Sequence, residues 1–150
     1  MPAQWLTTEE CETLLCREVY GRLATCGRNY QPYITPVNFV YLQNRIYIHS
    51  GLEGLKLDNI ADNPKVCFEI SGAGELIDRP KACNFSIHRW SVLVFGEVES
   101  ISDPNRKLAV LAALMEKYCA GSEYPPLTIT DMQSVNVLAV HIDKISGKRY

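Results

Sequence analysis

The segment His49-Ser-Gly-Leu-Glu-Gly-Leu-Lys56 holds residue types that suit the binding of a phosphate group. It lies where a strand pattern gives way to a helical one, and a helix N-terminus presents free backbone N–H groups and the positive end of its dipole. Ser50 adds a hydroxyl donor and Lys56 adds a cation. Gly51 and Gly54 allow a ligand to approach the backbone closely. These groups suit a phosphate monoester, although a plain strand–loop–helix corner with a solvated lysine would show the same residues.

The preceding strand pattern contains Pro36-Val-Asn-Phe-Val40. A proline inside a strand is typical of a sheet edge or a bulge, where backbone N–H and C=O groups stay free to bind a planar heterocycle. Asn38 is expected to project from a largely apolar face, where its amide needs a partner. A hydrogen bond within the core would satisfy that amide equally well.

A metal centre or a covalent mechanism has little support in the sequence. The histidines His49, His88 and His141 fall in different strand patterns and lack the short ligand spacing of zinc or iron sites. None of the six cysteines forms a C-x-x-C pair. A nucleophile elbow, a dinucleotide fingerprint and a P-loop are also missing from the chain. We therefore expect no metal ligands and no nucleophilic catalysis.

Length and composition indicate one globular domain spanning residues 1–150. The formal net charge of −2 makes nucleic acid a poor partner. No apolar run approaches the roughly 20 residues of a membrane span, and the N-terminus does not resemble a secretory signal. We expect a cytoplasmic protein with no membrane partner, in which most cysteines are small buried hydrophobes.

Periodicity predicts two or three helices that position these groups. One covers residues 8–20, with a capping box of Thr7 and Glu10 and a C-terminal stop at Gly21. A short one surrounds residues 54–59. Another opens with Asp103 and Pro104 and closes at Gly121. Its expected buried stripe is Leu108, Leu111, Met115 and Tyr118.

Six strand regions are predicted between these helices, and Gln43-Asn44 is expected to be the tight turn of a hairpin. The strand regions cover residues 22–26, 32–42, 45–50, 65–70, 83–101 and 135–145. Apolar residues on both sides of 32–42 predict that each of its faces is covered, and Gly96 marks a bend or bulge. Residues 71–80 and 122–134 are expected to be loops. Because helices and strands do not alternate regularly, an antiparallel barrel with helices outside it is favoured.

Six segments, in order, resemble the pyridoxamine 5′-phosphate oxidase-like flavin-binding split-barrel proteins, and most of all their nitroimidazole-resistance branch. The likeness runs from about residue 8 to the C-terminus. The segments are Gly21-Arg-Leu-Ala-Thr25, Pro36-Val-Asn-Phe-Val40, Ile46-Tyr-Ile-His-Ser50, Gly54-Leu-Lys56, Asn63-Pro-Lys-Val-Cys-Phe-Glu69 and Ser91-Val-Leu-Val-Phe-Gly96.

The resemblance implies a mainly β fold with flanking helices, a six-stranded antiparallel split β-barrel. It also implies a homodimer with FMN, or FAD in some members, at the interface. The isoalloxazine would lie along residues 37–40, and Gly147-Lys148 resembles a tail that reaches the partner's site. The cofactor-binding residues carried over are Arg22, Pro36, Val37, Asn38, Phe39, Val40, His49, Ser50, Gly51, Gly54, Lys56, Trp90, Ser91 and Lys148.

The activity implied by this resemblance is flavin-dependent reduction of small electron-poor compounds such as nitroimidazoles. His49 is the candidate catalytic residue because an imidazole can deliver a proton near neutral pH, and a phosphate-side hydrogen-bond donor is the alternative role. True pyridoxamine-phosphate oxidases have a longer C-terminal segment, which this chain lacks after Tyr150, so oxidation of vitamin B6 is not expected. A non-catalytic flavin-binding or sensing module and a haem or deazaflavin protein on the same barrel remain open.

Overall fold

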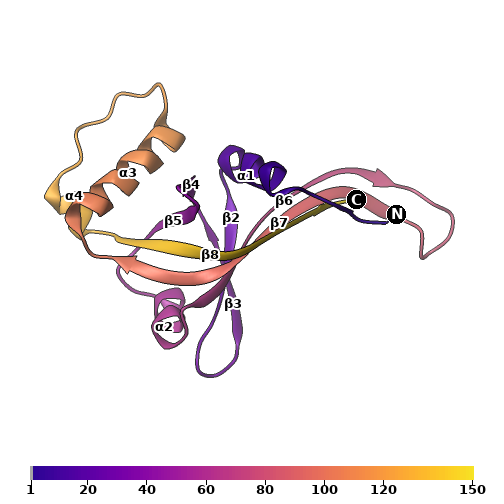
Figure 1. Cartoon of the computed structure of the whole chain (residues 1–150), viewed down its shortest axis with the longest axis horizontal. Coiled ribbons are helices and arrows are strands. Elements are labelled where there is room, and N and C mark those ends of the chain that lie inside the picture. Colours follow the sequence, from indigo (N-terminus) through magenta and orange to yellow (C-terminus); the bar gives the residue numbers. More distant parts are fainter. Residues whose placement is uncertain (1) are drawn as a thin grey trace.

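Eight strands form one antiparallel sheet, in the order β3-β2-β6-β7-β8-β5-β4 with β1 paired to β8 (Figure 1). The structure is a computed structural model and describes residues 2–150. The strands are β1 (Gln4–Trp5), β2 (Gly21–Cys26), β3 (Pro32–Val37), β4 (Val40–Leu42), β5 (Arg45–Ser50), β6 (Lys65–Ile77), β7 (Ser86–Ile101) and β8 (Asn136–Arg149). The helices are α1 (Thr8–Arg17), α2 (Leu55–Asp62), α3 (Pro104–Cys119) and α4 (Ile129–Gln133).

The link between β3 and β4 forces this sheet to close. These strands follow one another in the chain but stand at opposite ends of the strand order. In a flat sheet, six spacings of about 4.8 Å would put them roughly 29 Å apart. The link is only Asn38 and Phe39, and three Cα steps span at most about 11 Å. The sheet must therefore curl, which confirms the predicted barrel, with eight strands rather than six.

Local capping signals were predicted correctly. The Thr7 hydroxyl accepts from the Glu10 N–H at 3.2 Å, and the Glu10 carboxylate accepts from the Thr7 N–H at 2.8 Å. Asp103 caps α3, with Pro104 in the first turn. The predicted C-terminal end of α1, at residue 20, was wrong, because the helix ends at Arg17. Gly21 instead opens β2, where a Cβ would collide with the Phe68 ring.

Two strand predictions were also wrong. Residues 32–42 form two strands rather than one, and most of β3 is exposed instead of covered on both faces. The predicted loop at 71–80 is largely strand, because β6 continues to Ile77. Gly72 permits this continuation: it pairs with Trp90, and a Cβ there would lie 2.6 Å from the indole nitrogen. The glycine accommodates a large neighbour rather than ending the strand.

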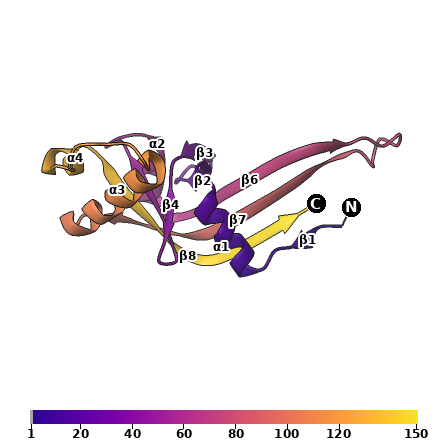
Figure 2. The ribbon, with the colours of Figure 1, turned by 90° about the horizontal axis from the view of Figure 1, so that it is seen from above.

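The β6–β7 pair extends beyond the barrel as a two-stranded arm (Figure 2). Leu76 and Phe85, at its far end, are 82% and 66% exposed. The predicted irregularity at Gly96 is confirmed by a register shift between β7 and β8 at this position. A Cβ at Gly96 would collide with the His141 carbonyl, so a side chain is excluded there.

Two apolar cores hold the molecule together. The first fills the barrel and includes Phe39 and Phe68, whose ring centroids are 4.7 Å apart. The second lies between α3 and the sheet, where Leu111 and Leu114 pack near Tyr47. The stripe predicted for α3 was partly wrong, since Leu108 is exposed and Val110 and Leu114 are buried in its place. The loop expected at 122–134 contains α4.

The prediction that most cysteines are buried was wrong. All six are free thiols, and Cys11 alone among them is buried. Cys26 and Cys67 alternate with buried residues of β2 and β6, so they lie on the side of the sheet away from the barrel core. Within residues 2–150, no helix is both long and apolar enough to span a membrane.

Candidate functional site

The N-terminus of α2 has free hydrogen-bond donors and no side-chain cap. Gly54 is the N-cap residue at a φ of 132°, and its carbonyl accepts from Leu57 at 2.9 Å and from Asp58 at 3.2 Å. The N–H groups of Leu55 and Lys56 precede these donors and so have no acceptor in the helix. A Cβ at Gly51 or Gly54 would meet no heavy atom within 4 Å. The two glycines therefore leave open space beside this helix end, where an anion can approach.

Lys56 provides a cation at this helix end. Its side chain is partly buried, and burial lowers its pKa because it penalises the charged form. No carboxylate lies within ion-pair distance of Lys56 among residues 2–150. A phosphate would supply the missing negative charge, so this corner fits the phosphate of a nucleotide.

Buried polar contacts fix α2 against the barrel. The Asn59 amide donates to the Thr25 hydroxyl at 3.0 Å, and both side chains are buried. Asn63, after the helix, donates to the Cys26 carbonyl at 3.0 Å. Ile60 packs into the barrel core. These contacts hold α2, and with it the helix N-terminus, in a set orientation against β2.

The structure does not bring the side chains of His49 and Ser50 together. Ser50 is buried on the barrel side of β5, in step with Ile46 and Ile48. His49 points to the opposite face, as neighbouring strand residues do. There it lines a cavity of about 280 Å³ between β5, α3 and α4, with apolar walls and Tyr118 nearby. The His49 side chain therefore lines the cavity under α3. The Ser50 side chain lies on the other face of β5, in the barrel interior.

Residues 37–40 cross from one end of the sheet to the other. The Phe39 N–H donates to the Tyr118 hydroxyl at 2.9 Å, and Lys117 donates to the Phe39 carbonyl at 3.0 Å. The Lys117 ammonium also lies 3.9 Å from the centroid of the Phe39 ring. Burial lowers the pKa of Lys117 and raises that of Tyr118. The backbone of Phe39 is thus already bonded to α3.

Asn38 differs from the prediction because its side chain is exposed rather than set in an apolar face. It has no hydrogen-bond partner within residues 2–150. Its amide is therefore available to a ligand. Sequence reasoning missed Lys117, because nothing in its spacing marks a contact with a residue 78 positions away.

Three other predicted cofactor residues share one side of the sheet, which we term the outer face: Arg22, Ser91 and Lys148. Ser91 pairs directly with Lys148 on β8 and with Ser71 on β6. Arg22 donates to the Ser71 hydroxyl at 3.0 Å and forms an ion pair with Glu69. Its charge is therefore already balanced by a carboxylate.

Trp90 does not lie on the outer face. It pairs with Gly72 and Arg149, and it points to the opposite side of the sheet from Ser91. Pro36 pairs with Arg22 and is exposed. No group of three or more His, Cys, Asp or Glu side chains that could hold a metal occurs in the described part of the chain.

Comparison with known proteins agrees with this fold. Residues 7–149 match the family model described as pyridoxamine 5′-phosphate oxidase, and the chain belongs to that family. An uncharacterized protein of Rhizobium meliloti (strain 1021) is 31% identical over 103 residues, which cover 59% of this chain and 67% of the relative.

Two solved structures are also similar to this chain. One is a proposed 5-nitroimidazole antibiotic resistance protein from Bacteroides thetaiotaomicron, with a TM-score of 0.85 and 25% identity over 99% of this chain and 87% of that one. The other is an FAD- and haem-binding protein from Mycobacterium smegmatis, with a TM-score of 0.86 and 21% identity over 99% and 73% of the two chains. The family resemblance predicted from the sequence is thereby confirmed.

Proposed function

We propose that this protein binds a flavin nucleotide, FMN or FAD, with its phosphate at the N-terminus of α2. The observation that carries the proposal is the uncapped helix end beside an unpaired, partly buried lysine, Lys56. Membership of the pyridoxamine 5′-phosphate oxidase family supports it, as does the similarity to a protein that binds FAD and haem. Gly51 and Gly54 leave room for the phosphate oxygens.

The chain's own residues would bind and orient the ring, and the flavin would supply two-electron redox chemistry. The exposed Asn38 amide and the backbone of Val37 and Val40 are the groups proposed to contact the ring edge. Phe39 contributes by fixing this segment to α3 through Tyr118. Ser50 would sit beneath the phosphate loop, where its hydroxyl now donates to the Gly51 carbonyl at 3.1 Å.

We further propose a homodimer with the flavin near the interface. The outer face of the sheet carries partly exposed apolar side chains, including Cys67, Leu93 and Phe95, and Phe95 is 41% exposed. Covering them with a second copy would remove apolar surface from water. Ser91 and Lys148 of each copy would then lie at the contact. Sedimentation velocity at several concentrations tests the dimer.

The proposed activity is reduction of small electron-poor compounds such as nitroimidazoles. In the two-electron step a nitro group would take up two electrons and two protons and give a nitroso group and water, with NAD(P)H or another reductant, itself oxidised by two electrons, as the electron source. His49 is proposed to hold one of these protons, because it lines the cavity under α3. The likeness to a proposed nitroimidazole-resistance protein supports this substrate class.

The absorption spectrum of the purified protein, before and after soaking in FMN or FAD, tests the flavin proposal. The two absorption bands of oxidised flavin, retained after desalting, are the expected result. A protein that stays colourless refutes the phosphate site, and a sharp Soret band after haem titration would favour the haem alternative instead. If flavin binds, faster reoxidation of the reduced protein on adding a nitroimidazole supports the activity. Reoxidation unchanged across a panel of such compounds favours a non-catalytic module.

A further inference from the structure

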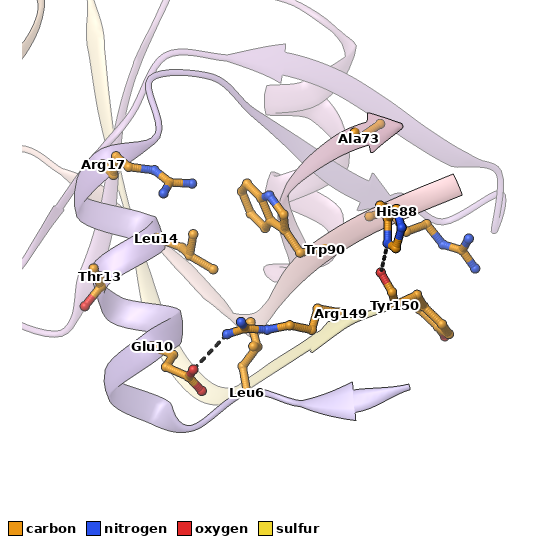
Figure 3. Close-up of a pocket in the computed structure, with 12 residues that line it drawn as sticks. Leu6, Glu10, Thr13, Leu14, Arg17, Ala73, His88, Trp90, Arg149 and Tyr150 are labelled. Carbon is orange, nitrogen blue, oxygen red and sulfur yellow. Dashed lines mark hydrogen bonds and ion pairs between the residues drawn. The ribbon is translucent and has the colours of Figure 1, made fainter. Parts of the chain in front are cut away.

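A cavity of about 550 Å³ lies between α1 and the paired strands β7 and β8 (Figure 3). Leu6 and Leu14 form an apolar wall, and the Trp90 indole projects into the cavity from β7. The volume falls within the range of about 300–1,000 Å³ that holds small organic ligands. None of the phosphate-site residues at α2 lines it.

The charge of this cavity favours an anion. The side chains of Arg17 and Arg149 bring two guanidinium groups to it, and Glu10 brings one side-chain carboxylate. Arg89 also borders the cavity, but its side chain lies on the other side of the sheet from Trp90, over the Tyr150 ring. Arg149 forms an ion pair with Glu10 at 2.7 Å, but the two side chains are 48% and 44% exposed. Such exposed pairs contribute little and are readily shared with an incoming anion. Arg17 likewise pairs at the surface with a glutamate outside the cavity.

The shape of the cavity favours an aromatic ligand. The Arg17 guanidinium carbon lies 5.6 Å from the Trp90 ring centroid, and the side chains of Arg17 and Leu14 point from α1 toward the indole (Figure 3). The indole N–H has no hydrogen-bond acceptor within residues 2–150. A planar ring against Trp90 would place an attached carboxylate close to Arg17 and Arg149. We propose that this cavity binds a small aromatic carboxylate, with its ring on Trp90 and its carboxylate on these two arginines.

This site is separate from the proposed flavin site. Trp90 and Arg149 are strand neighbours of Ser91 and Lys148, so their side chains lie on opposite sides of the sheet. The proposal does not rest on flavin binding. A failure of one proposal would leave the other standing.

Titration with benzoate tests the site in the chain of 150 residues. Trp5 and Trp90 are the two tryptophans of the chain, so Trp5→Phe leaves Trp90 as the single tryptophan, whose emission can be excited selectively. Benzoate should change the Trp90 emission in a saturable way. Benzyl alcohol should bind at least about tenfold more weakly, because it lacks the charge and so loses the charge-assisted hydrogen bonds. Acetate should also bind at least about tenfold more weakly, because it lacks the ring that would bury apolar surface against Trp90.

Arginine variants locate the carboxylate. Arg17→Gln and Arg149→Gln should each weaken benzoate binding about tenfold, by the loss of one charge-assisted contact. Arg106→Gln removes an exposed arginine of α3 that is ion-paired with Glu99, and it should leave benzoate binding unchanged. Circular dichroism shows whether each variant is folded, and calorimetry with benzoate provides a readout that does not depend on Trp90.

Three results would overturn the proposal. The first is the absence of saturable benzoate binding by both fluorescence and calorimetry. The second is equal binding of benzoate and benzyl alcohol, which would make the arginines irrelevant. The third is loss of benzoate binding in protein saturated with FMN, which would make the cavity part of the flavin site. An unchanged benzoate dissociation constant with FMN bound is the expected result.

Discussion

Replacing Lys56 by methionine should weaken FMN binding far more than riboflavin binding. Methionine keeps the length and helix propensity of the side chain, and it removes the charge. Lys56 is partly buried and has no carboxylate partner among residues 2–150. A bound phosphate would therefore be the only anion that its ammonium group interacts with. A hydrogen bond from a charged group contributes about 1.5–3 kcal/mol, which corresponds to a roughly 10- to 150-fold rise in the dissociation constant.

Fluorescence quenching of FMN and of riboflavin measures this difference, since riboflavin has the same ring without the phosphate. The wild-type protein should bind FMN more tightly, and the Lys56 variant should lose that preference while its affinity for riboflavin stays the same. Lys65→Met is a matched control, because Lys65 is an exposed lysine at the start of β6. The FMN affinity of the wild type should also fall with added salt.

The pH dependence provides a second check on the role of Lys56. Burial lowers the pKa of Lys56 in the free protein, so the lysine loses its proton at a lower pH than an exposed lysine would. FMN binding should therefore weaken on the alkaline side in the wild type but not in Lys56→Met. Equal losses of FMN and riboflavin affinity in the variant, or no loss of either, would refute the phosphate assignment.

Three further substitutions test the structure around the site. Asn59→Ala leaves the Thr25 hydroxyl without its buried partner and should lower the unfolding free energy by about 1–3 kcal/mol in urea. Gly96→Ala forces a methyl group against the backbone of β8 and should cost about 1–3 kcal/mol or more. A hydrogen bond from Arg106 is the main reason that the pKa of Glu99 is lowered to about 2 from its usual 4.5. The stabilisation from Glu99 is therefore full above pH 4.5 and is lost as the pH falls through about 2, so the Tm gap between wild type and Glu99→Gln should narrow over that window.

Each of these has an outcome that would contradict it. Unchanged urea midpoints would show that the Asn59 bond contributes nothing. Gly74→Ala serves as the control for Gly96→Ala, because its Cβ would meet neighbours at an ordinary 3.6 Å, and equal effects of the two would refute the clash. A Tm gap for Glu99→Gln that stays constant between pH 4.5 and 2 would contradict the lowered pKa.

Local sequence signals predicted the structure where the chain interacts with itself over a few residues. The Thr7 and Glu10 capping box formed as expected. The Gln43-Asn44 turn formed with φ of 47° and 60°, the left-handed values that a tight hairpin turn needs. Residues 49–56, which we propose bind a phosphate, also formed a strand end followed by a helix N-terminus, as predicted.

Contacts between distant segments were not predictable in the same way. Gly72 looked like a strand breaker because its partner, Trp90, lies 18 positions on and only the pairing register reveals the fit. The bonds from α3 to Phe39 cross 78 and 79 positions. The separation of His49 from Ser50 was predictable, however, because adjacent residues of any strand point to opposite faces.

The two-residue link at Asn38 and Phe39 also determines how the barrel can open. The β2–β3 and β4–β5 ladders can stay intact while β3 and β4 move apart at the ends far from this link, because these two strands are not neighbours in the strand order. The burial of Phe39 and its bonds to Tyr118 and Lys117 hold this link in place. Release of α3 would therefore be a local opening of lower free energy than global unfolding. Native-state hydrogen exchange of the Phe39 amide would report on that motion, and with it on how often the segment proposed to hold the flavin ring comes away from α3.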